Sequence, residues 1–241
     1  MKLLTDQNMR TFTGIVASNA AEGFPATNLQ QYDPGLIWKA AAFTGDINIV
    51  IDLGAAAAIP QIWLNNANFT SVTMQANAAD SWSSPSVSKS VTLAKDDIGI
   101  YKGFFDLSAT NYRYVRIVIP VQALTSGIVP QLGNIIIGTA SDLRVASWAA
   151  QTTRNVSRFQ PDGGGNRKKP KGRWWHVFSV GVSGTKAEVD AIVLSGWEAA
   201  IIFTDLADVA DSYLVYPPES TSKSIRNPLD AERSFALEEL V

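Results

Sequence analysis

The sequence contains no cysteine and a single histidine, His176, within 241 residues. The absence of cysteine excludes disulfide bonds, a thiol nucleophile and every metal site that needs thiolate ligands. One histidine excludes metal centres with several imidazole ligands. Charged residues make up only 17% of the chain and the net charge is -2, so no strong overall field draws it to nucleic acid. These absences favour binding or assembly over catalysis.

Long apolar runs are also missing. No run approaches the roughly 18 residues that a membrane-spanning helix needs. The first ten residues, MKLLTDQNMR, include polar residues where a secretory leader has its apolar core. We therefore expect no membrane insertion. The 46% of hydrophobic and 10% of aromatic residues are typical of an ordered protein, and the length predicts one large domain or two modest ones.

The pattern from residue 47 to 137 predicts β-structure. Short apolar or alternating segments are separated by turn residues, and the segment 47–54 is expected to end at Gly54. The clearest strand is 112–119, which Pro120 should end. Its alternation predicts two faces, one with Tyr112, Tyr114, Arg116 and Val118, the other with Arg113, Val115, Ile117 and Ile119. A short buried strand is expected at 133–138, and the whole predicts a β-sandwich or jelly roll.

The pattern changes after residue 138. A strand at 174–182 precedes a capping box, Thr185 to Glu188, which predicts a helix, and further strands are expected at 201–204, 212–216 and 233–240. The fold class is therefore mainly β, with an N-terminal β-sandwich jelly roll followed by a small α+β barrel-like domain with one helix. We place the two domains at 1–143 and 144–241.

Residues 24–138 resemble the galactose-binding-like, discoidin-type jelly roll. The resemblance rests on five segments, which are 25–29, the solitary Trp38, 49–54, 59–64 and 112–117. This family implies the sandwich fold, and it includes lectins, lipid binders and inert spacers.

Residues 148–241 resemble the β-barrel-plus-helix domain of distal tail and tail-tip ring proteins of long-tailed bacteriophages. The match lies in the order of an arginine-bearing strand, a Gly/Lys loop, a paired strand, a capped helix and a charged final strand at 232–240. The resemblance implies a hexameric ring at the end of the tail tube. It also implies contacts with the tube and other tail-tip proteins, and a location in the virion after synthesis in the host cytoplasm.

Carbohydrate binding by the jelly roll would need an exposed aromatic face and polar groups that grip hydroxyls. The candidates are Trp82, in a Ser/Asp-rich loop, with Tyr32, Asn65 and Asn68. Trp38 and Trp63 lie where the fold needs core and are interpreted as structural. The ligand would be a host-surface glycan.

A basic stretch in the second half holds seven cations and one carboxylate within residues 154–173. Its glycines and proline predict a loop. We consider a solvated loop, a subunit or tube contact, and a channel lining that faces DNA. The candidates for an assembly or channel contact are Arg167, Lys168, Lys169, Lys171, Arg173 and Trp174.

We identify no catalytic residue in the sequence. No carboxylate at a fixed spacing would orient His176 as a base, and the adjacent pairs Asp96–Asp97 and Glu238–Glu239 point to opposite faces of a strand. No metal or cofactor is expected. The sequence therefore predicts a non-enzymatic structural component of a phage tail tip. A carbohydrate-binding lectin-like module is the alternative, and an accessory protein of an esterase or glycosidase is a third possibility.

Overall fold

The computed structural model describes residues 11–31, 35–59, 61–96, 99–107, 111–124 and 128–139 with their side chains. Beyond these it describes the backbone of strands only, at 2–5, 141–142, 145–154, 174–184, 200–203, 212–215, 221–227 and 230–238. The chain divides into two compact units, Met1–Asp142 with Ile201–Ser212, and Leu143–Ala200 with Tyr213–Val241. The boundary at 143/144 stays a prediction.

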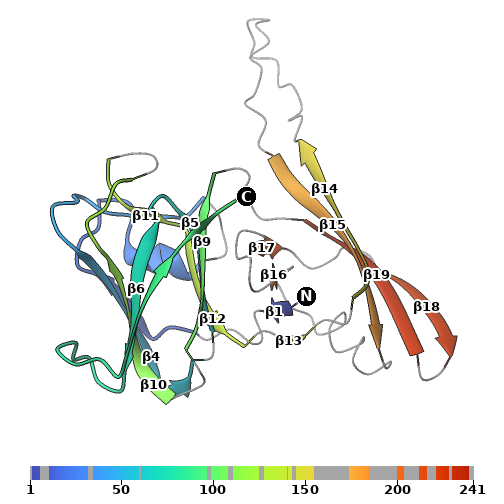
Figure 1. Cartoon of the computed structure of the whole chain (residues 1–241), viewed down its shortest axis with the longest axis horizontal. Coiled ribbons are helices and arrows are strands. Elements are labelled where there is room, and N and C mark those ends of the chain that lie inside the picture. The colour runs from blue at the N-terminus through green and yellow to red at the C-terminus, as the bar shows by residue number, and fades with distance from the viewer. Residues whose placement is uncertain are drawn as a thin grey trace, which may run out of the picture. The chain divides into compact units, whose positions relative to one another are not determined.

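The first unit contains a β-sandwich, as the sequence predicts (Figure 1). One layer is a five-stranded antiparallel sheet in the order β2-β4-β10-β6-β7, and the other is a four-stranded sheet in the order β12-β5-β9-β8. The strands of the first layer are β2 (Gly14–Ala17), β4 (Ile47–Ala58), β10 (Asn111–Ile119), β6 (Ser71–Asn77) and β7 (Val87–Thr92). Those of the second are β12 (Asn134–Gly138), β5 (Gln61–Ala67), β9 (Tyr101–Asp106) and β8 (Ala94–Lys95).

Smaller elements complete the unit. The 3-10 helix η2 (Ala26–Gln30) buries Ala26 and Leu29. A two-stranded ribbon joins β3 (Trp38–Lys39) to β11 (Gln131–Leu132), and β1 (Lys2–Thr5) pairs with β13 (Ser141–Asp142). The strand β16 (Ala200–Phe203) comes later in the chain.

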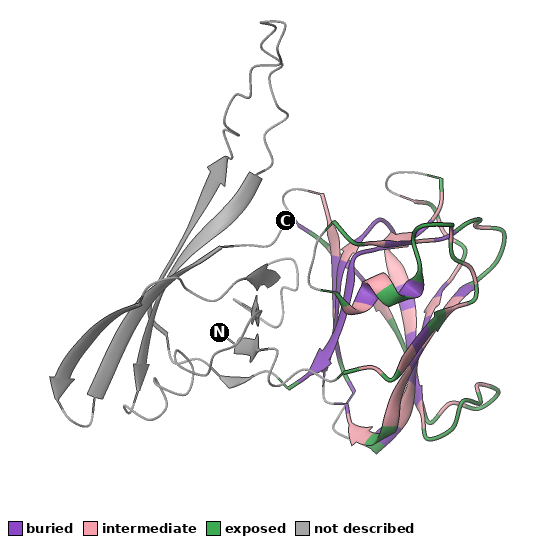
Figure 2. Ribbon diagram, turned by 180° about the vertical axis from the view of Figure 1, so that it is seen from behind, coloured by how far each residue is buried: buried purple, intermediate pink, exposed green. Residues whose placement is uncertain are grey.

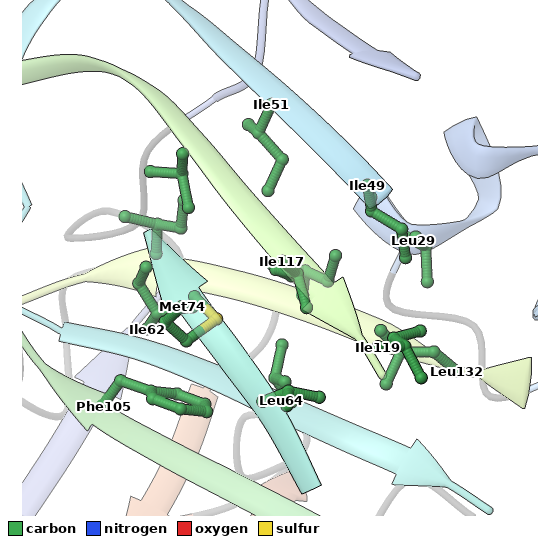
Figure 3. Packing of buried hydrophobic residues seen from close by; sticks show 14 of the residues in the cluster. Leu29, Ile49, Ile51, Ile62, Leu64, Met74, Phe105, Ile117, Ile119 and Leu132 are labelled. Atoms are coloured by element: carbon green, nitrogen blue, oxygen red, sulfur yellow. The ribbon is translucent and has the colours of Figure 1, made fainter. Parts of the chain in front are cut away.

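The core lies between the two layers, where apolar side chains of alternating positions meet. Figure 3 shows Ile49, Ile51, Ile117 and Met74 of the five-stranded sheet in the same cluster as Ile62, Leu64 and Phe105 of the four-stranded sheet. All seven of these side chains are fully buried. Exposed residues lie mainly in the loops around this core (Figure 2).

The alternation predicted for the strand 112–119 is wrong at Tyr112 and Arg113. Tyr112 pairs with Ala57, whereas Tyr114 pairs with Asp52, so the register is interrupted at Arg113. Such an irregularity shifts the two-residue period, because the partner strand supplies extra residues. Tyr112 is therefore buried with Val115, and Arg113 shares the outer face with Tyr114. The faces of Val115 to Ile119, and the end of the strand before Pro120, are as predicted.

Gly54 does not end its strand, as the sequence suggested, but lies inside β4 at this irregularity. Its φ of 78° belongs to the left-handed region, and a Cβ here would lie 2.3 Å from Thr13 Oγ1. The Gly54 N–H donates to Asp52 Oδ1 at 2.7 Å. The glycine therefore lets β4 bend and continue to Ala58.

The second unit contains a four-stranded antiparallel sheet in the order β14-β15-β19-β18. Its strands are β14 (Val145–Arg154), β15 (Trp174–Gly184), β19 (Asp230–Glu238) and β18 (Thr221–Asn227). The short strand β17 (Ser212–Val215) lies between β15 and β18 in the sequence and is not part of this sheet. The predicted strands at 174–182 and 233–240 are confirmed, while β18 was not expected. The predicted helix after Thr185 lies outside the described residues.

Candidate functional site

The outer face of the five-stranded sheet carries a row of side chains whose order follows from the strand register. Arg116 of β10 pairs with Val50 of β4 on one side and with Gln75 of β6 on the other, and Gln75 pairs with Ser88 of β7. Because the neighbours of Arg116 and Gln75 along their strands are buried in the core, these two side chains face outward, and Ser88 is exposed beside Gln75. The row therefore joins a cation, an amide and a hydroxyl across three strands.

Trp82 lies in the β6–β7 loop and contacts Arg116 of this row. The Arg116 guanidinium carbon is 4.6 Å from the centroid of the Trp82 ring, which places the cation over one face of the indole. The Trp82 Nε1–H donates to Asp80 Oδ1 at 2.6 Å. Two contacts thus fix the plane of a ring that is itself only half-buried.

The loop that holds Trp82 is braced by Asn77, the last residue of β6. Asn77 donates through Nδ2 to the carbonyl of Ser81 at 2.6 Å and accepts at Oδ1 from the Ser86 hydroxyl at 2.9 Å. Its Oδ1 also accepts from the Ala78 N–H at 2.9 Å. One side chain therefore ties together the two arms of the loop, as asparagine commonly does in turns.

Arg116 is also hydrogen-bonded to a side chain of the neighbouring strand β6. Its Nε donates to Gln75 Oε1 at 2.7 Å, and Gln75 Nε2 donates to Ser88 Oγ at 3.2 Å. Partial burial lowers the pKa of Arg116 from its ordinary value, since desolvation disfavours the charged form, while the carboxylate of Asp80 opposes this shift. The guanidinium remains a cation at any physiological pH.

The neighbouring Arg113 has a different environment. Its Nε and Nη2 donate to the two carboxylate oxygens of Asp52 at 2.8 and 2.9 Å, a bidentate ion pair. The hydrogen bond from Arg113, together with the Gly54 N–H, lowers the pKa of Asp52. The same bond to Asp52 raises the pKa of Arg113. The two arginines of β10 thus differ, because within the described residues Arg113 already forms an ion pair with a carboxylate and Arg116 does not.

The structure does not bring the predicted sugar-binding residues together. Trp82 follows β6 at the end of the sandwich where β4 turns into β5, whereas Asn65 and Asn68 lie at the other end of β5. Asn68 is 3% exposed, donates to the Val129 carbonyl at 3.0 Å and accepts from the Gln131 N–H at 2.9 Å. Its amide therefore holds the segment before β11.

The Asn68 amide is thus engaged within the fold, and a sugar contact by Asn68 stays a prediction that its burial does not favour. Asn65 is also buried, at 9% exposure, and offers little surface to a ligand. Tyr32 lies outside the described residues. Trp38 and Trp63 are 0% and 1% exposed, so their structural interpretation is confirmed.

The assembly candidates of the basic loop, Arg167, Lys168, Lys169, Lys171 and Arg173, also lie outside the described residues. Trp174 begins β15, where its backbone pairs with Arg154 of β14. His176 lies on the same strand, opposite Thr152.

Sequence reasoning missed Arg116 and Gln75 as site residues. The outward face of Arg116 was predicted from alternation, but its contact with Trp82 depends on the pairing of β10 with β6. The signal available beforehand was a pair of arginines, Arg113 and Arg116, in a strand rich in apolar and aromatic residues, and a tryptophan in a polar loop.

Within the part of the chain that the structure describes, no group of three or more His, Cys, Asp or Glu residues could hold a metal ion. Among these same residues no helix has the length and apolar character needed to span a membrane.

Comparison with known proteins gives structural likeness only. No protein-family model matches the chain. No curated protein matches it.

The solved structures that it resembles include carbohydrate-binding modules. Chitosan-binding module 1, derived from a chitosanase/glucanase of Paenibacillus sp. IK-5, is 20% identical, with 55% of this chain and 98% of that chain covered and a TM-score of 0.43. A Streptococcus pneumoniae fucose binding module is 11% identical, with 54% and 95% covered and a TM-score of 0.42.

A mutant lectin binding domain of lectinolysin, complexed with Lewis b, is 14% identical, with 57% and 99% covered and a TM-score of 0.45. At these TM-scores the likenesses assign no ligand to this chain.

Proposed function

We propose that the first unit is a non-catalytic carbohydrate-binding module and that Trp82 is its principal contact. The observation that carries the proposal is a half-buried indole whose plane is fixed by Asp80 and Arg116. An aromatic ring with one face packed and further surface open suits the apolar face of a sugar ring, as amphipathic aromatic side chains suit many ligands.

The surroundings of the ring support this proposal. Sugar hydroxyls need donors and acceptors at defined positions, and Gln75, Ser88 and Arg116 provide amide, hydroxyl and guanidinium groups in one row. Because hydrogen bonds already hold Trp82 and its loop, binding would order few side chains, which lowers the entropic cost of association.

Replacement of Trp82 by alanine is expected to weaken glycan binding by about 30-fold, which corresponds to about 2 kcal/mol for a central tryptophan contact. Titration calorimetry against a panel of neutral and acidic polysaccharides would measure this change. Trp82→Phe keeps an aromatic face and should retain most of the affinity.

Lys89→Gln is the matched control, because Lys89 alternates with Ser88 and Ser90 and does not belong to the row. The thermal unfolding midpoint of each variant should equal that of the wild type, since Trp82 lies outside the core. The proposal would be contradicted if the protein bound no glycan of the panel, or if the Trp82→Ala variant bound as well as the wild type.

For the second unit we propose assembly into a closed ring of a phage tail tip, linked to host-binding parts. The observation that favours this role is a sheet whose outer strands are β14 and β18. No other strand of the described residues pairs with their outer edges, and such edges can pair with another copy in a head-to-tail contact.

Purified protein is expected to form closed rings, because a heterologous contact closes when its rotation divides a full turn. The resemblance to tail-tip ring proteins implies about six copies. Native mass spectrometry and negative-stain images would show them. Exchange of Arg167, Lys168, Lys169 and Lys171 for serine tests whether the basic loop contributes to assembly. A chain that stays monomeric at all concentrations, and is absent from purified tails, would overturn this second role.

A further inference from the structure

Arg116 differs from Lys102 and Arg113, two other cations at buried or partly buried positions of the described residues, in its lack of an ion pair. Lys102 contacts the carboxylate of Asp96 at 3.0 Å, and Arg113 contacts that of Asp52 at 2.8 Å. No carboxylate in the described part of the chain forms such a pair with Arg116. A partly desolvated guanidinium with no carboxylate in ion-pair contact is electrostatically unfavourable, which makes it a natural place for an anion.

The geometry around Arg116 restricts how an anion could approach. The guanidinium carbon lies 4.6 Å from the centroid of the Trp82 ring, and the Nε–H is already donated to Gln75. Arginine has five N–H donors, so the four on the two Nη atoms remain for a ligand that arrives in the plane. Two parallel N–H groups at this edge match the two oxygens of a carboxylate.

We propose that the ligand of this site is an acidic glycan, in which a uronic-acid carboxylate pairs with the Nη atoms of Arg116 beside the Trp82 ring. This inference rests on the proposed carbohydrate-binding function and names the chemical class of its ligand. The hydroxyl groups of the same sugar would face Ser88 and Gln75, which continue the row across the sheet.

The carboxylate of Asp80 should also affect the affinity of this site for an anion. Its carboxylate orients Trp82 and is close enough to act on Arg116 electrostatically, so it opposes an incoming anion. Asp80→Asn keeps an oxygen acceptor for the Trp82 N–H and removes the negative charge. Affinity for an acidic glycan should rise by roughly threefold, as expected for one repulsive charge at a solvated distance of several ångströms.

The test uses the full chain and two polymers that share one backbone, polygalacturonate and its fully methyl-esterified form. The wild type should bind polygalacturonate at least tenfold more tightly, and this preference should shrink as salt is raised from 50 to 500 mM. Arg116→Gln should remove the preference, and Arg116→Lys should restore it in part. Lys89→Gln should not change it.

Dextran sulfate and neutral dextran distinguish sulfate from carboxylate as the recognised anion. Preference for dextran sulfate over polygalacturonate would overturn the assignment of a uronic acid. Equal binding of the two galacturonan forms, weakened by Trp82→Ala but not by Arg116→Gln, would overturn the inference and leave the carbohydrate-binding function standing. Binding of none of these polymers, nor of any in the wider panel, would overturn both. The esterification comparison needs no variant, so it holds even if Arg116→Gln were to misfold.

Discussion

Asp96→Ala is expected to lower the free energy of unfolding by about 3–5 kcal/mol, the range for a buried ion pair that loses one partner. The side chains of Asp96 and Lys102 are each 3% exposed, and Lys102 Nζ lies 3.0 Å from Asp96 Oδ2. Asp96 Oδ1 also accepts from the Ile100 N–H at 2.7 Å, which shapes the β8–β9 turn. The alanine variant would leave the Lys102 ammonium in a dry site and the turn without its acceptor.

Urea unfolding followed by circular dichroism would measure this loss. The double variant Asp96→Leu with Lys102→Met should recover most of it, since two apolar groups replace two charges. Lys95→Ala is a matched control on the same turn, because Lys95 is exposed, and it should cost no more than about 0.5 kcal/mol. A loss below about 1 kcal/mol for Asp96→Ala would show that the pair is not essential to the fold.

Trp38→Ala should cost a similar 3–5 kcal/mol, because a large fully buried ring would leave a cavity. Trp38 lies on β3, where it pairs with Leu132 of β11, and it belongs to the core cluster. Its Nε1–H is buried without a hydrogen-bond partner. Trp38→Phe should therefore cost much less, about 1 kcal/mol, since loss of an unsatisfied donor offsets part of the lost packing.

The comparison of the two Trp38 variants is the informative measurement. If Phe were as destabilising as Ala, the indole N–H would have to contribute a hydrogen bond that the structure does not contain. Trp82→Ala serves as the control for loss of a tryptophan outside the core, and its unfolding free energy should stay within about 0.5 kcal/mol of the wild type.

Strands whose residues carry a complete local signal were predictable from the sequence. Three consecutive isoleucines, at 135–137, lie between Gly133-Asn134 and Gly138, and the strand β12 is buried throughout. The strand β10 alternates over most of its length and ends before a proline. Such strands can be predicted because the burial of each residue follows from the two-residue period of its own strand, with no information about the partner strand.

Features that depend on a second strand were not predictable. The irregularity at Arg113 exists because β4 supplies extra residues opposite it, and this reversed the faces of Tyr112 and Arg113. The burial of Asn68 depends on backbone groups of residues 129 and 131, more than 60 positions away. Nothing in the sequence next to Arg113 or Asn68 indicates which distant residues will pair with them.

The strand-like periodicity by itself determined a mainly β protein, and the lack of cysteine excluded disulfide bonds and thiolate metal sites. Only the tertiary structure decided that Trp82 stands over Arg116, and that Asn65 and Asn68 lie at the opposite end of the sandwich. The physical reason is that strand identity is set by local side-chain periodicity. The neighbours of a side chain across a sheet are set instead by register, which long-range pairing fixes.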